Sequence, residues 1–155
     1  PKFFVTRDMN LAKTLKWAGK KQEARAALER AAGQLNENPE VHKMLGSYML
    51  DDGDFASAIS EYKKAVELSN DDPDMIFALA LAYSRVGLKK EAIKTYKNLL
   101  RMENPIPEAY ANLATVFLES NQVDEAFKVI KSGLAKYPES SALFAPHWRS
   151  EASRG

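Results

Sequence analysis

Apolar side chains recur along this chain in clusters with spacings of 3 and 4 residues, which is the period of an α-helix. The clusters themselves recur, because the same order of large, small and apolar positions returns after 34 residues. The most regular pair is a leucine followed by a small residue: Leu11-Ala12, Leu45-Gly46, Leu79-Ala80 and Leu113-Ala114. We interpret these as packing positions, and four copies in phase predict a helical repeat protein.

A second set of positions keeps the same interval in the later half of each copy. Its members are the small residues Ala24, Ala58, Ala92 and Ala126 and the larger Leu28, Tyr62, Tyr96 and Ile130. Between the two clusters of each copy stands Gly19, Gly53, Gly87 or Asn121, residue types that reach positive φ at low cost and so end a helix. Each copy is therefore predicted to be a helical hairpin.

The start of each later copy carries the signals of a helix N-terminus. Pro39, Pro73 and Pro107 are each followed by an acid, as expected in a first helical turn. Asn38 and Asp72 are predicted N-caps, whereas Ile106 has no side-chain acceptor. The predicted helix pairs are 6–18 and 21–34, 39–52 and 55–68, 73–86 and 89–102, and 107–120 and 123–136.

This arrangement resembles the tetratricopeptide repeat, whose signature of Trp-x2-Leu-Gly-x2-Tyr, then Ala-x3-Phe, then Pro has the same period and offsets. The resemblance covers residues 5–138 and implies an all-α, right-handed superhelical solenoid of four helical hairpins. It places repeats at about 5–38, 39–72, 73–106 and 107–140 in a single domain, 1–155. The chain departs from the signature in the late proline, present only as Pro138, and at the fourth position, which is Asp8, His42, Ile76 and Tyr110.

The two ends of the chain are less regular than its repeats. Phe3 and Phe4 precede the first copy, and Pro1 stands where an initiator Met would, so the start looks processed or excised. A partial fifth helix begins at residue 141, with Phe144 at the aromatic position, before Pro146 interrupts it. The segment 141–155 is either an improvised cap or part of a longer array, and we favour the longer array.

Composition narrows the class of partner. With 45% apolar and 28% charged residues, the 155-residue chain is typical of one soluble domain. Its 22 basic and 21 acidic residues nearly cancel, so we expect no nucleic acid partner and no attraction to an anionic membrane. The longest uncharged runs, among them residues 75–84, are too short for direct membrane insertion. The absence of cysteine excludes disulfides and leaves the compartment open.

No constellation of catalytic side chains is present in the sequence. His42 and His147 lie in separate copies, so we expect surface or groove histidines and no metal site. Phosphate-loop, G-x-S-x-G and H-E-x-x-H motifs do not occur. The acidic run 51–54 lacks the spacing of a calcium loop and is explained by turn chemistry. The sequence therefore predicts a protein that is not an enzyme and holds no cofactor.

A basic stripe follows one face of the predicted helix 89–102. It consists of Lys90, Lys94, Lys97 and Arg101, with Lys128 and Lys131 at the equivalent places in the next copy. A solvated helix face is the simpler explanation. Binding of phosphates or lipid headgroups is the alternative, and it would weaken steeply with salt.

In the family that the chain resembles, the first helices of successive repeats line a concave groove that holds a peptide or a partner helix. The resemblance places these residues in that groove: Lys13, Trp17, Lys43, Ser47, Leu50, Phe77, Leu81, Arg85, Thr115 and Leu118. The basic set with which some members clamp a chaperone's C-terminal carboxylate is missing. As alternatives, Phe77 packs between repeats, and Trp17 covers Phe3 and Phe4 as an end cap.

Two functional hypotheses follow from the sequence. The leading one is an adaptor or scaffold that binds a protein or peptide partner in the groove, centred on Phe77, Leu81 and Arg85. The other is a structural assembly module that self-associates, or forms part of a longer array, through its irregular termini, where Phe3, Phe4 and Phe144 lie.

Overall fold

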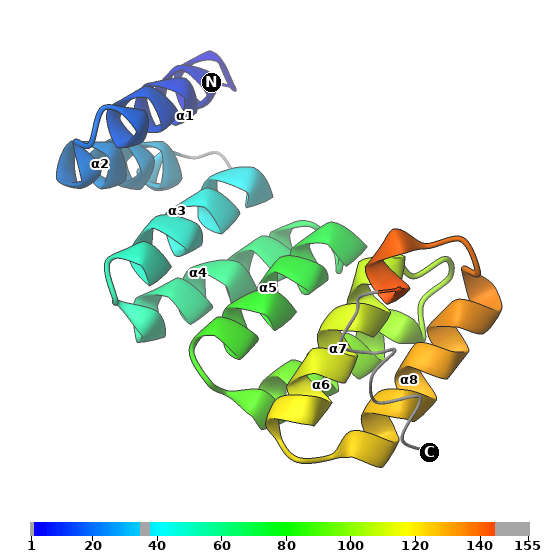
Figure 1. Cartoon of the computed structure of the whole chain (residues 1–155). Helices are drawn as coiled ribbons and strands as arrows, with labels where there is room; N and C mark the ends of the chain where they lie inside the picture. Colours follow the sequence, from blue (N-terminus) through cyan, green and yellow to red (C-terminus); the bar gives the residue numbers. More distant parts are fainter. Residues whose placement is uncertain (1, 35–37, 145–155) are drawn as a thin grey trace. The chain divides into compact units, whose positions relative to one another are not determined.

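A computed structural model describes residues 2–34 and 38–144 of the chain, with side chains from residue 5 onward (Figure 1). These residues form eight α-helices and one 3-10 helix, η1, and they contain no strand. The helices pair in chain order, and their bounds are α1 Lys2–Trp17, α2 Lys21–Gly33, α3 Pro39–Asp51, α4 Phe55–Leu68, α5 Pro73–Arg85, α6 Lys89–Leu100, α7 Pro107–Glu119, α8 Val123–Lys136 and η1 Ser141–Leu143.

The turns and caps that the sequence predicts set these bounds. Gly19, Gly53 and Gly87 have φ of 82°, 82° and 83°, and Asn121 has φ of 60°, so each ends the first helix of its hairpin. The Asn38 and Asp72 side chains each accept a backbone N–H two residues on, at 2.9 and 2.8 Å. The helix pairs are confirmed to within about two residues, except that α1 begins at Lys2.

Small residues allow the helices of a hairpin to approach closely. Ala24, Ala58 and Ala92 are completely buried. A Cβ atom added at Gly46 would lie 2.9 Å from two ring atoms of Tyr62, so the α3–α4 packing requires glycine there. Gly133 has the same role in the α7–α8 hairpin, where an added Cβ would lie 2.9 Å from the Tyr110 ring. The predicted all-α fold of helical hairpins is confirmed at this level.

The chain divides into two compact units, Pro1–Ala82 and Tyr83–Gly155, with the boundary inside α5. In the first unit, α3 packs against both α2 and α4, and Val5, Ala31 and Val41 from three helices share one core. In the second unit, α7 packs against α6 and α8. The single domain and the right-handed superhelix stay predictions.

The first repeat corrects one predicted packing position. Leu45, Leu79 and Leu113 are buried, but Leu11 at the equivalent place is 41% exposed. Among the side chains of α1 that the structure describes, the buried ones are instead Val5, Asp8 and Ala12. The physical reason is that no helical hairpin precedes α1 within the described residues, so the face that carries Leu11 has no neighbour to cover it.

The C-terminal part of the described chain is a single turn. Leu143 of η1 is buried against α7 and α8, and Phe144 after it is exposed. The predictions for Pro146 and His147, and those for the side chains of Phe3 and Phe4, lie outside the described residues. The choice between an end cap and a longer array stays a prediction.

Candidate functional site

The ten residues predicted to bind a partner lie on the first helices of the four hairpins. Seven belong to the first unit, and Arg85, Thr115 and Leu118 belong to the second. Lys13, Trp17, Leu81, Arg85 and Thr115 are exposed, and Lys43, Ser47, Phe77 and Leu118 are partly buried. We call the first helix of each hairpin its helix A. The name helix-A surface stands for the exposed and partly buried residues of this set in the first unit: Lys13, Trp17, Lys43, Ser47, Phe77 and Leu81.

Leu50 corrects the predicted set. Its side chain is only 6% exposed, so it belongs to the core. The reason is that α3 packs against both α2 and α4. Two neighbouring helices bury more of its surface than the single apolar stripe of a helix that packs on one side. The partner-binding set therefore loses Leu50.

Trp17 is the most exposed large apolar side chain of the described chain, at 90%. Trp17 is therefore not packed against the described side chains, and the alternative in which it covers Phe3 and Phe4 involves side chains outside the described residues. Leu81 on α5 is also exposed, and Phe77 one turn before it is partly buried, so Phe77 contributes to packing as well as to the surface. Two first helices of the first unit thus present apolar side chains to solvent.

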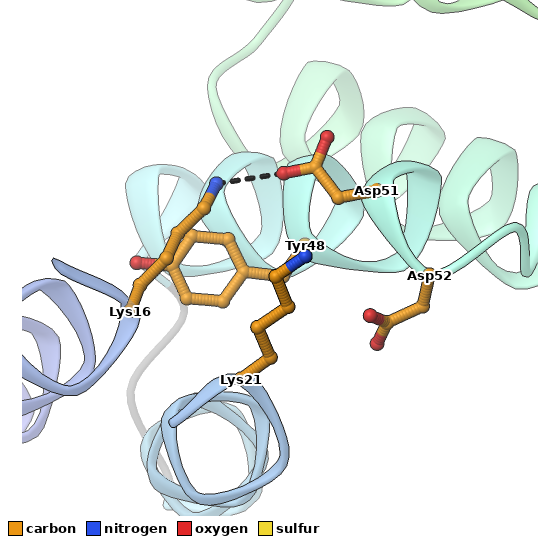
Figure 2. Close-up of a pocket in the computed structure, with 5 residues that line it drawn as sticks. All are labelled: Lys16, Lys21, Tyr48, Asp51 and Asp52. Carbon is orange, nitrogen blue, oxygen red and sulfur yellow. Dashed lines mark hydrogen bonds and ion pairs between the residues drawn. The ribbon is translucent and has the colours of Figure 1, made fainter. Parts of the chain in front are cut away.

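A small cleft lies where α1 and α2 meet α3, lined by Lys16, Lys21, Tyr48, Asp51 and Asp52 (Figure 2). Its free volume is about 10 Å³, room for one water molecule. The Lys16 Nζ atom lies 2.7 Å from Asp51 Oδ2 and 4.4 Å from the centroid of the Tyr48 ring. Burial raises the pKa of the Tyr48 phenol, Lys16 opposes the rise, and Asp51 adds to it.

Arg25 of α2 makes a second link to the following hairpin. Its Nη2 atom lies 3.0 Å from Asp54 Oδ2, its Nη1 atom lies 3.4 Å from Asp52 Oδ2, and its Nε atom lies 3.0 Å from Glu29 Oε1. The pKa of Asp54 is lowered first by a hydrogen bond from the Ser57 side chain and then by Arg25. The acidic run 51–54 therefore joins the first two hairpins, a role beyond the turn chemistry that the sequence predicts.

His42 corrects another expectation. It is not a surface or groove residue but is buried, with Nδ1 2.6 Å from Glu61 Oε2 of α4. The hydrogen bond with His42 holds the pKa of the Glu61 carboxyl below its ordinary value, and nearby Lys64 acts in the same direction. Within residues 2–34 and 38–144, no three His, Asp or Glu side chains are grouped closely enough to hold a metal ion.

In the second unit the candidate residues are less distinctive. The Thr115 hydroxyl donates to the Ala111 carbonyl oxygen at 3.0 Å, and this back-bond ties it to its own helix. The cations of the basic stripe are all exposed, from Lys90 on α6 to Lys131 on α8. Lys97 Nζ lies 5.5 Å from the Phe117 ring centroid, and Lys128 is paired with Glu125 at 3.3 Å. The exposure fits a solvated face, and binding by this stripe stays a prediction.

Two family models match the sequence. One, described as a TPR repeat, matches residues 46–87, and the other, described as a tetratricopeptide repeat, matches residues 77–141. No curated protein sequence matches the chain. None of the described helices is long and apolar enough to cross a membrane.

Solved structures of similar fold include proteins described as tetratricopeptide-repeat proteins. A crystal structure of MamA is 24% identical, with a TM-score of 0.75 over 87% of this chain and 79% of MamA. The structure of YrrB, described as a TPR protein with an unusual peptide-binding site, is 17% identical, with a TM-score of 0.75 over 94% of this chain and 74% of YrrB. A tetratricopeptide repeat protein from Parabacteroides merdae is 17% identical, with a TM-score of 0.74 over 90% of this chain and 56% of its own. These likenesses show the fold.

Proposed function

This chain belongs to the tetratricopeptide-repeat family, and we propose that it is a scaffold that binds a peptide or helix of a partner protein on the first helices of its repeats. Repeats of this kind typically serve protein interaction and not catalysis. YrrB, which has a similar fold, is described as having a peptide-binding site, and this supports the proposal. The partner's identity does not follow from the fold, because one scaffold hosts many functions.

The observation that carries the proposal is the exposure of large apolar side chains on the helix-A surface. Trp17 is 90% exposed and Leu81 is 41% exposed. Exposed apolar groups of this size mark interaction sites, and tryptophan is among the residues that most often dominate binding energy.

We expect Leu81→Glu and Arg85→Glu to weaken peptide capture without unfolding the chain, because both side chains are exposed. The measurement is selection from a display library of random dodecapeptides, followed by titration of the enriched peptides. Leu88→Glu is the matched control, since Leu88 is 42% exposed but lies at the N-cap of α6, outside the predicted binding set. Circular dichroism checks that all variants remain helical.

Two results would contradict the proposal. Selection on the parent chain could enrich no peptide, or Leu81→Glu and Leu88→Glu could retain the same peptides as the parent. The first result excludes capture of linear segments, and the second places capture elsewhere on the molecule.

Self-association is a second candidate function, favoured by the two exposed apolar side chains at the ends of the described chain. Leu11 and Phe144 are exposed to the same extent. If these faces join copies of the chain, the molar mass by light scattering rises with concentration, and Leu11→Asn with Phe144→Asn restores a monomer. A monomer at every concentration removes this candidate.

A further inference from the structure

We propose that the partner of the helix-A surface is an acidic segment that carries an apolar side chain, and that α1 and the start of α2 bind this part of it. The inference rests on the proposed function and deepens it. We use the name α1 anchor for the residues that would bind it: Lys13, Trp17, Lys20 and Lys21.

The apolar part of the α1 anchor is Trp17 in the last turn of α1. A tryptophan ring left almost wholly in water loses favourable burial, and a partner that covers it recovers that free energy. Lys13 lies one helical turn before Trp17 on the same face, so one bound segment can contact both side chains. An apolar or aromatic side chain of the partner would pack on the ring.

The charged part of the α1 anchor is found by following each lysine to its partner. Lys16 is paired with Asp51 at 2.7 Å, and Lys43 is paired with Glu40 at 3.3 Å. In contrast, Lys13, Lys20 and Lys21 have no acidic group within ion-pair distance among the described residues. The uncompensated positive charge of this region therefore lies at α1 and the start of α2.

The nearby acids of the chain are already engaged. Asp51 binds Lys16, and Asp52 and Asp54 bind Arg25, although Lys21 lines the same cleft as Asp52 (Figure 2). Residues 13–24 include four lysines and a single acid, Glu23. The free lysines are thus available to carboxylates supplied from outside the chain.

The rest of the surface favours a polypeptide over other anions. A nucleic acid would need a basic path that continues past α1, but Lys43 on α3 is already neutralised by Glu40. Stable binding to a bilayer would need more inserted apolar area than one tryptophan offers. A peptide can place carboxylates at the α1 anchor and an apolar side chain against Phe77 and Leu81 on α5, which are exposed or partly buried.

The test is selection of random dodecapeptides on the parent chain, followed by titration of the enriched peptides against variants. We expect enrichment of Asp and Glu next to a large apolar residue. Trp17→Ala and Lys20→Glu/Lys21→Glu should each weaken these peptides about tenfold or more. Lys90→Glu/Lys94→Glu is the control of equal charge change on α6, and it should change affinity less than about twofold.

The outcomes separate this inference from the proposed function. Two results overturn the α1 anchor and leave the proposed function standing. In the first, the enriched peptides lack acids. In the second, the peptides bind Lys20→Glu/Lys21→Glu as tightly as the parent but bind Leu81→Glu more weakly. Absence of any enriched peptide overturns both. The remaining probes are vesicles of phosphatidylserine and phosphatidylcholine and a single-stranded oligonucleotide. If either probe binds in a way that depends on Trp17, and acidic peptides are not enriched, the inference is also overturned.

Discussion

At the residue scale, the pair of His42 and Glu61 shows that a position of the repeat can stay buried while the residue type at that position changes. The fourth position of the repeat is buried in all four copies, as Asp8, His42, Ile76 and Tyr110. A buried histidine needs a hydrogen-bond partner, and Glu61 provides it at 2.6 Å. The pair therefore belongs to the α3–α4 packing and not to a binding surface.

We expect Glu61 to stabilise the fold in a pH-dependent way. Its pKa is lowered by His42, so its contribution is fully present above the unfolded value near 4.5 and is lost as the pH falls through the folded value. Above about pH 5, Glu61→Gln should therefore lower the unfolding free energy by about 1–2 kcal/mol, with the difference shrinking in more acidic solution. Urea unfolding at a series of pH values measures it.

Glu67→Gln is the matched control, since Glu67 lies on the same helix and is exposed. A difference between parent and Glu61→Gln that stays constant down to about pH 3 would show that the charge of Glu61 is not what stabilises the pair.

At the scale of elements, two kinds of contact hold the hairpins of the first unit. Within a hairpin, small residues such as Gly46 let α3 and α4 approach closely. Between the first two hairpins, the shared core of Val5, Ala31 and Val41 is reinforced by the ion pairs of Lys16 and Arg25. These ion pairs are partly exposed, so we assign most of the stability to the packing.

Gly46→Ala should destabilise the chain by about 1–3 kcal/mol, because its new Cβ would overlap the Tyr62 ring. Gly33→Ala is the matched control, since nothing lies within 4 Å of an added Cβ at this helical position. It should be neutral or stabilising by about 0.5–1 kcal/mol through helix propensity. Thermal unfolding that ranks the two variants in the opposite order would show that α3 and α4 are not so closely packed.

At the scale of the whole molecule, the chain consists of two compact units joined within α5. In repeat proteins each hairpin contacts only its neighbours, so stability is approximately a sum of local terms. A lesion in one hairpin should therefore be felt most strongly near its own position in the chain.

In Gly46→Ala we expect amide hydrogen exchange to speed up most in α3 and α4 and least in α7 and α8, which lie in the other unit. Mass spectrometry of peptides from each helix measures the difference between variant and parent. An equal acceleration in all helices would mean that the two units unfold together as one cooperative domain, which is the organisation predicted from the sequence.

The sequence by itself determined the helices, their hairpin pairing and the positions of tight packing except that of Leu11. Those features depend on local chemistry, namely the apolar period, the N-caps at Asn38 and Asp72 and the positive φ at Gly53 and Gly87. They also repeat four times, so each copy supports the others.

Only the tertiary structure decided which side chains are exposed and which charges are paired. Leu50 is buried because two neighbouring helices enclose α3, and Leu11 is exposed because no hairpin covers its face within the described residues. Lys16 and Lys21 look equivalent in the sequence, yet only Lys16 meets an acid of α3, at 2.7 Å. Such differences arise from contacts between residues far apart in the chain, and a helical period carries no information about them.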